Sequence, residues 1–142
     1  MSERAGGEPG EENATMIKVV TLFKRREGIS HQEFRDYYED HHCKLFEEHL
    51  KKPGVKRYVR RYLKPSFDAI SGEVHSSGFD ALMELWVEKE WFDAYYGGDL
   101  DPEFRALIAA DEEKLFDRAH IYKHIVEEEC DTVLPLPDTP AS

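Results

Sequence analysis

The stretch ISHQEFRDYYEDHHCKLFEEHL, residues 29–50, decides the fold of this chain. It opens with a helix start signal, because Ser30 and Glu33 have the spacing of a capping box, in which each side chain bonds to the other residue's backbone N–H. The residues that follow at helical spacing on one stripe are Phe34, Tyr38, Leu45 and, at ideal geometry, His41. The spacing therefore predicts a helix with one buried face.

The same stretch carries two tyrosines, an acidic pair and then two adjacent histidines, His41 and His42. Histidine changes charge near neutral pH, so a histidine at the wall of a cavity suits general acid–base catalysis. On an ideal helix His41 lies nearer the centre of the stripe, and His42 lies on its rim. Helix ends depart from ideal spacing, so both histidines remain candidates for a residue that faces a cavity.

The segment LFKRREGISHQEFRDYYEDHHCKLF, residues 22–46, resembles the start of EthD-type domains, which belong to the dimeric α/β-barrel superfamily. In that family a strand ends in a basic pair, and a turn leads into a helix with a recurring pattern of aromatic residues and a histidine. The matching positions here are Phe34, Tyr37, Tyr38, His42 and Leu45. Cys43 and Lys44 replace the usual Ala and Pro, so we expect the helix to continue past His42. The resemblance spans about residues 16–127 and favours His42 over His41.

Hydrophobic periodicity divides the rest of the chain into short strands and helices. Strands are predicted over 16–25, 55–64, 79–88 and 119–126, and residues 65–78 are predicted to form a loop. A short helix is expected at 89–96, and Asp101 followed by Pro102 indicates the start of another. This order predicts a ferredoxin-like α+β fold, βαββαβ, with a four-stranded antiparallel sheet and helices on one face.

One layer of helices covers only one face of such a sheet, yet large side chains also fall on the other face. They are Leu82, Trp86 and either Tyr58 or Val59. Apolar residues on both faces require a cover on both sides. The resemblance implies that the second cover is the same sheet of another subunit, so we expect a homodimer through the sheet face.

The net charge of −11 is concentrated at the ends of this 142-residue chain. Residues 1–15 are expected to form a disordered leader, and residues 128–142 an acidic, proline-containing tail. The middle of the chain has 21 acidic against 18 basic residues, which argues against nucleic acid as a partner. No apolar run has the pattern of a signal peptide or a membrane span, and Cys43 and Cys130 have no metal or disulfide spacing. A cytoplasmic protein that does not bind membranes is expected.

Two residues are the candidates for catalysis, His42 and Asp111. The apolar face of the helix after Asp101 is predicted to carry Phe104, Leu107, Ile108, Asp111 and Leu115. A carboxylate on such a face is costly unless it is paired, and such groups are frequent at functional sites. The alternative is an ordinary salt bridge from Asp111 to Arg25, Arg26 or a lysine on a strand.

Six further residues are candidates for binding a substrate: Tyr37, Tyr38, Tyr58, Glu84, Trp86 and His124. Structural alternatives exist for two of them: Tyr58 could fill an interface, and Glu84 could pair with an arginine such as Arg57 or Arg61. His120 and His124 are predicted to share one face of the last strand. A metal site is not expected there, because no carboxylate or cysteine falls in step with them.

The resemblance implies a cofactor-free enzyme that acts on a small aromatic or polyketide-like substrate by acid–base catalysis, with a lyase as the leading reaction class. Decarboxylases, dehydratases and cyclases of this type mainly need a proton moved in a dry pocket. Two alternatives stay open. The first is a non-catalytic dimeric domain that binds a ligand or assists a partner enzyme, and the second is a cofactor-independent monooxygenase.

Overall fold

The computed structural model describes residues 16–50, 54–98 and 100–138, and the predicted leader, 1–15, lies outside them. The elements follow one another in the order β1 (Met16–Phe23), α2 (His31–Tyr37), η2 (Tyr38–His42), α3 (Cys43–Leu50), β2 (Val55–Tyr62), β3 (Ala81–Glu88), α4 (Lys89–Tyr96), α5 (Pro102–Leu115), η3 (Arg118–His120) and β4 (Tyr122–Ile125). The element η2 is a π-helix and η3 a 3₁₀ turn. The predicted βαββαβ order is confirmed.

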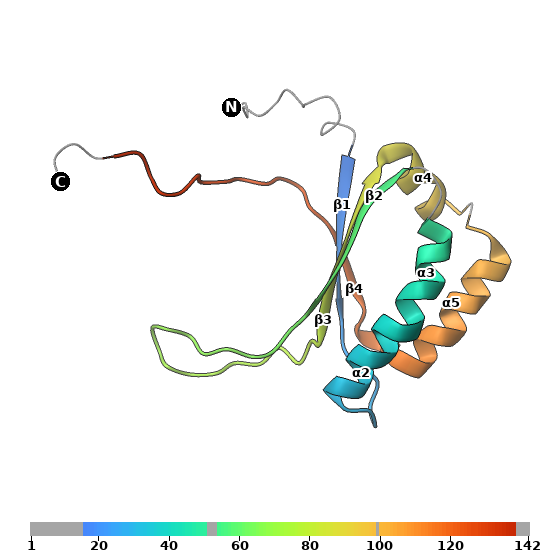
Figure 1. The fold of residues 1–142 in the computed structure, drawn as a ribbon, viewed down its shortest axis with the longest axis horizontal. Helices are drawn as coiled ribbons and strands as arrows, with labels where there is room; N and C mark the ends of the chain where they lie inside the picture. The colour runs from blue at the N-terminus through green and yellow to red at the C-terminus, as the bar shows by residue number, and fades with distance from the viewer. Residues whose placement is uncertain (1–15, 51–53, 99, 139–142) are drawn as a thin grey trace.

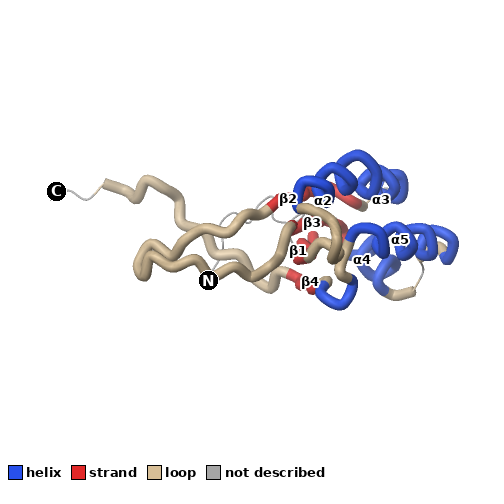
Figure 2. Tube along the Cα trace, turned by 90° about the horizontal axis from the view of Figure 1, so that it is seen from below, coloured by secondary structure: helices blue, strands red, loops and turns tan. Residues whose placement is uncertain are grey.

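The four strands form one antiparallel sheet in the order β2-β3-β1-β4, with the helices on one of its faces (Figures 1 and 2). β1 lies in the centre, where Val19 pairs with Leu85 of β3 and Val20 pairs with His124 of β4. This is the ferredoxin-like arrangement that the sequence predicts.

The core fills the space between the sheet and the helices. β3 alternates strictly between buried and half-buried residues, as its period-2 pattern predicts. The largest fully buried side chains are Tyr38, Phe34, Leu85, Leu115, Val87, Thr21 and Cys43. Because Phe34 and Tyr38 come from α2 and η2, this helical stretch supplies the centre of the core, and its position is fixed by packing.

The second face of the sheet carries Trp86, Glu84 and Val59, and no helix of the described chain covers it (Figure 1). Tyr58 and Tyr62 pair with Leu85 and Ala81 and so face the helices, which assigns Val59 to the open face. Of the two residues of β2 that were candidates for the open face, Tyr58 and Val59, it is Val59 that lies there.

Two segments extend away from the sheet on the side opposite the helices (Figure 1). One joins β2 to β3 and contains the predicted loop, 65–78; the other follows β4 and contains the described part of the tail. The tail has no helix or strand up to residue 138. Apolar side chains on both segments are exposed: Phe67, Ile70, Val74, Val133, Leu134 and Leu136.

The last strand and the buried face of α5 differ from prediction. The last strand was expected at 119–126 but covers only Tyr122–Ile125, because the Asp117 side chain caps the 3₁₀ turn that precedes it. Leu107 was expected on the buried face of α5 but is exposed. The N-terminus of α5 is as predicted, with the Asp101 carboxylate accepting the backbone N–H of Phe104 and Pro102 in the first position.

Candidate active site

The helix that carries the two histidines begins with the predicted capping box. The Ser30 hydroxyl accepts the backbone N–H of Glu33 at 3.0 Å, and the Glu33 carboxylate accepts the backbone N–H of Ser30 at 2.8 Å. These two bonds satisfy donors that the first turn of a helix leaves free. The start of the helix is therefore fixed by residues next to it in sequence.

One π-helical turn, η2, decides which histidine is buried. His42 is 5% exposed, whereas the side chain of His41 is 52% exposed. Ideal 3.6-residue spacing places His41 on the buried stripe, and that expectation is wrong here. A π-turn holds more residues per turn than an α-turn, so the stripe shifts by one position and passes through His42. The helix continues into α3 after His42, as the replacement of the usual proline by Lys44 predicts.

The carboxylate of Asp111 on α5 lies at the centre of a polar cluster with η2. Its Oδ2 is 2.7 Å from Nδ1 of His42, and its Oδ1 accepts the Tyr37 hydroxyl at 2.5 Å. Nδ1 of His41 lies 3.5 Å from the same Oδ1. The alternative of a salt bridge from Asp111 to Arg25, Arg26 or a strand lysine is wrong: Arg25 instead pairs with Asp80, at 2.9 Å.

These contacts set the protonation states of the cluster. Burial and the hydrogen bond to Asp111 raise the pKa of Tyr37 to about 12, so its hydroxyl keeps its proton at neutral pH. Burial by itself would raise the pKa of Asp111, but the hydrogen bonds from Tyr37 and His42 outweigh it and hold that pKa below its ordinary value. Because an ionised carboxylate only accepts, Nδ1 of His42 carries a proton, and in the neutral ring Nε2 is the nitrogen with the lone pair.

Aromatic rings hold the imidazole of His42 in place. The rings of Tyr38 and Phe116 meet it edge to face, at centroid distances of 5.4 and 5.3 Å. Tyr37 stacks on the exposed ring of His41 at 4.9 Å. His42 therefore has a fixed orientation in an apolar surrounding, with one nitrogen bound to a carboxylate.

Comparison with known proteins agrees with this fold. The sequence profile of the EthD domain matches residues 26–119. The chain belongs to the EthD domain family. No match emerged among curated protein sequences.

Three solved structures are similar to this EthD-domain chain at low identity. An ethyl tert-butyl ether D (EthD) family protein from Bacillus halodurans C-125 is 22% identical, with a TM-score of 0.53 over 80% of this chain and 99% of that one. A protein from Arabidopsis thaliana is 14% identical, with a TM-score of 0.53 over 82% and 99%. A hydroxynitrile lyase from Passiflora edulis is 13% identical, with a TM-score of 0.45 over 82% and 97%.

The other residues predicted for substrate binding divide between the two faces of the sheet. Tyr38 on η2 and Tyr58 on β2 lie in the layer between the helices and the sheet, and the Tyr38 ring lies 5.4 Å from that of His42. Burial raises the pKa of each tyrosine. Glu84, Trp86 and His124 lie on the open face, so a single chain does not bring them to the His42 cluster. Glu84 lies 3.6 Å from Arg61, as the structural alternative for it predicts.

The prediction that His120 and His124 share a strand face is wrong, because His120 belongs to η3 and its Nδ1 lies 2.8 Å from Asp117. Among the described residues, no three His, Cys, Asp or Glu side chains are grouped closely enough to hold a metal ion. The described chain also has no helix that is long and apolar enough to cross a membrane.

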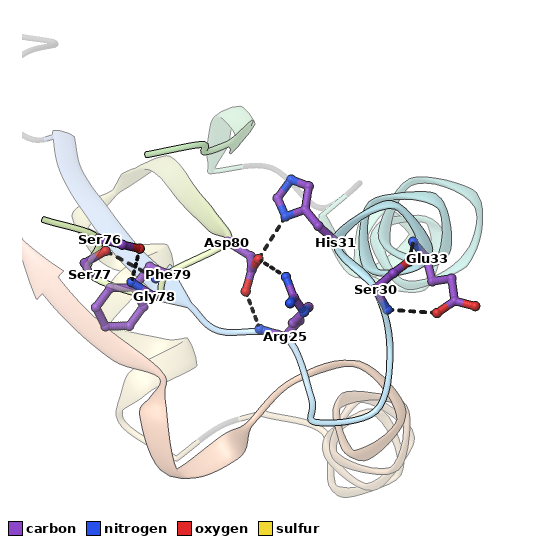
Figure 3. A network of polar contacts seen from close by, with 9 residues as sticks. All are labelled: Arg25, Ser30, His31, Glu33, Ser76, Ser77, Gly78, Phe79 and Asp80. Carbon is purple, nitrogen blue, oxygen red and sulfur yellow. Dashed lines mark hydrogen bonds and ion pairs between the residues drawn. The ribbon is translucent and has the colours of Figure 1, made fainter. Parts of the chain in front are cut away.

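Sequence reasoning missed two polar clusters. In the first, Glu39 on η2 binds Arg60 of β2 through two contacts at 2.7 and 2.9 Å and accepts the Tyr62 hydroxyl at 2.6 Å. In the second, Asp80 joins His31 to Arg25 (Figure 3). No local signal in the sequence identifies the partners of Asp80, which are 49 and 55 positions away.

Proposed function

We propose that this protein is a cofactor-free lyase, a decarboxylase or a dehydratase/cyclase, that acts on a small aromatic or polyketide-like substrate by acid–base catalysis. The observation that carries the proposal is the 2.7 Å contact between Nδ1 of His42 and Asp111. A histidine aligned by a carboxylate can take a proton at Nε2 and return it in a later step.

Each residue of the cluster has a distinct role in such a reaction. His42 moves the proton: in a decarboxylation, Nε2 takes the proton of the substrate's carboxyl group, and loss of CO₂ leaves the electron pair of the broken C–C bond on the substrate as an enolate. The imidazolium then returns the proton to the carbon that lost CO₂. In a dehydration, Nε2 takes a proton from carbon, and the imidazolium so formed returns that proton to the departing hydroxide, which leaves as water. Asp111 stabilises the imidazolium, since its lowered pKa keeps it ionised. Tyr37 donates a hydrogen bond to Oδ1 of Asp111, the carboxylate oxygen that does not contact His42, and so helps to orient this carboxylate.

A second candidate function is a non-catalytic one, in which the cluster only ties η2 to α5. The observation that favours it is the 5% exposure of His42, because a substrate reaches this ring only if the side chains around it move. Buried polar groups are normally hydrogen-bonded for structural reasons alone. In that case the protein binds a ligand or a partner without converting it.

The test replaces His42 by Gln and compares it with His41→Gln as the matched control. Turnover is measured on a panel of β-keto acids and hydroxylated polyketide aromatics, together with the melting temperature of each variant. For a catalytic His42, we expect kcat to fall by about 100- to 10,000-fold. His41→Gln should change both quantities little, because its ring is half exposed.

The melting temperature separates the two candidates. If His42→Gln lowers the melting temperature but turns over the substrate as fast as the wild type, the cluster is structural and the lyase proposal fails. Tyr37→Phe adds a graded test, since it removes one hydrogen bond from Asp111 and leaves the His42 contact in place. A catalytic cluster should then lose rate without losing the ability to bind substrate.

A further inference from the structure

A cavity of about 700 Å³ lies apart from the His42 cluster, and none of that cluster's residues line it. It forms where β1 ends, α2 begins and the segment between β2 and β3 leaves and rejoins the sheet. This volume is in the range of small-molecule sites in proteins. Part of its wall is apolar and comes from Ile29, Leu63 and Phe79.

Cations dominate the polar part of the wall. Lys24, Arg26 and Lys64 line the cavity, and none of them forms an ion pair within the described part of the chain. The side chain of Lys24 lies against Gly78, where a Cβ atom would come within 2.9 Å of its Cε. Gly78 has a φ of +86°, a conformation that glycine adopts readily. Because glycine has no Cβ, it also leaves room for the side chain of Lys24.

The acidic residues of the wall are largely occupied by other partners. Asp80 is bound by Arg25 and His31, and Asp117 lies 2.8 Å from Nδ1 of His120. Lys24 lies near enough to Asp117 to contribute to its lowered pKa, after the larger effect of the hydrogen bond from His120. Glu27 is the remaining acid of the wall and is exposed. The wall is therefore basic although the whole chain has a net charge of −11, and a basic wall favours the binding of an anion.

His31 adds a directed polar group to the cavity. Its Nδ1 lies 2.8 Å from Oδ1 of Asp80, which also accepts the Arg25 guanidinium at 2.9 Å, while Oδ2 accepts the Arg25 backbone N–H at 2.9 Å (Figure 3). Because a carboxylate with these donors only accepts, Nδ1 of neutral His31 is protonated and Nε2 is an acceptor. Nε2 points away from Asp80 (Figure 3) and has no hydrogen-bond partner among the described residues.

We propose that this cavity is a binding site for a hydroxylated organic acid. The carboxylate of the ligand binds Lys24, Arg26 and Lys64, its hydroxyl donates to Nε2 of His31, and its apolar body packs against Leu63 and Phe79. The site is independent of the chemistry proposed for His42, since the two share no residue. It remains a binding site even if the His42 cluster is only structural.

Calorimetric titration with three matched probes tests the ligand chemistry. Hydroxybenzoates carry both the charge and the hydroxyl, benzoate lacks the hydroxyl, and the hydroxybenzamides lack the charge. We expect the best hydroxybenzoate to bind with a Kd of about 1 mM or tighter. Benzoate and the matching hydroxybenzamide should each bind about tenfold more weakly. Equal affinity for a hydroxybenzoate and its amide, or no saturation by any hydroxybenzoate, overturns the proposal.

Variants locate the site. The double variant Lys24→Gln/Arg26→Gln should weaken hydroxybenzoate binding by about tenfold or more, whereas Lys89→Gln, an exposed lysine on α4 outside the cavity, should change it less than about twofold. His31→Gln should remove the preference for hydroxybenzoate over benzoate. His75→Gln, at an exposed histidine of the segment between β2 and β3, should keep it. Binding that survives both cavity variants unchanged places the ligand elsewhere and refutes the site.

Discussion

At the scale of single residues, the carboxylate of Asp111 connects three side chains. It is buried on α5 and interacts with Tyr37, His41 and His42, all of which come from one helical stretch. The lowered pKa of Asp111 means that the folded protein stabilises its ionised form. Its contribution to stability is therefore complete above the unfolded pKa of about 3.9 and is lost as the pH falls through the folded pKa.

The variant Asp111→Asn should lower the free energy of unfolding at neutral pH by about 1–3 kcal/mol, because an amide is a weaker acceptor for the Tyr37 and His42 donors. It should also flatten the decline in stability below about pH 4. Urea unfolding at several pH values measures both effects. Asp36→Asn, on the exposed side of α2, serves as the control and should keep the wild-type pH profile. If the stability of the wild type and of Asp111→Asn changed with pH in parallel, the folded protein would not stabilise the ionised form of Asp111, and the prediction would be wrong.

At the scale of elements, the junction between α2, η2 and α3 holds the helical layer to the sheet. Glu39 of η2 reaches β2, where it binds the Arg60 guanidinium with both oxygens and accepts the Tyr62 hydroxyl. The hydrogen bond from Arg60, helped by that from Tyr62, lowers the pKa of Glu39 despite its partial burial. Bidentate pairs of this kind are strong because two charge-assisted bonds share one geometry.

We expect Glu39→Gln to lower the free energy of unfolding by about 1–2 kcal/mol, since the amide retains one acceptor but loses the charge. The neighbouring exposed Asp40→Asn should change it by less than about 0.5 kcal/mol. Chemical denaturation of both variants at neutral pH makes the comparison. Equal effects of the two variants would mean that removal of any negative charge from this helix, and not the contact of Glu39 with β2, accounts for the lower free energy of unfolding.

At the scale of the whole molecule, the open face of the sheet lacks a cover in the described chain. Trp86 lies on this face, and its ring is 4.3 Å from Nζ of Lys18 and 5.6 Å from the Arg57 guanidinium. The segment between β2 and β3 and the tail extend past this face on the same side and carry exposed apolar residues (Figure 1). Exposed apolar groups on such a scale are typical of interaction surfaces. We therefore expect a second copy of the chain to pack against this face.

The variant Trp86→Glu tests this homodimer, because a two-fold contact places the new charge near its own copy. Sedimentation should show a dimer for the wild type and a monomer for the variant, with circular dichroism to check that the monomer is folded. Leu107→Glu, on the exposed side of α5, is the control and should stay dimeric. A stable dimer of Trp86→Glu would place the interface on another surface.

The sequence alone was sufficient for features that depend on neighbouring residues. Period-2 alternation predicted β3, and Asp101 with Pro102 predicted the start of α5. The capping box of Ser30 and Glu33 predicted the start of α2. These signals work because backbone dihedrals, caps and side-chain period are set within a few residues of each other. The order of such elements then predicted the ferredoxin-like fold.

Tertiary structure alone decided which side chains meet. The π-turn of η2 moved the buried position from His41 to His42, and packing of α5 brought Asp111 to it across 69 positions of sequence. Folding likewise joined His31 to Asp80 across 49 positions. Such contacts follow from how whole elements pack and which polar groups must find partners once buried. Local spacing holds no information on that choice, since the partner of a buried carboxylate is set by the element that closes over it.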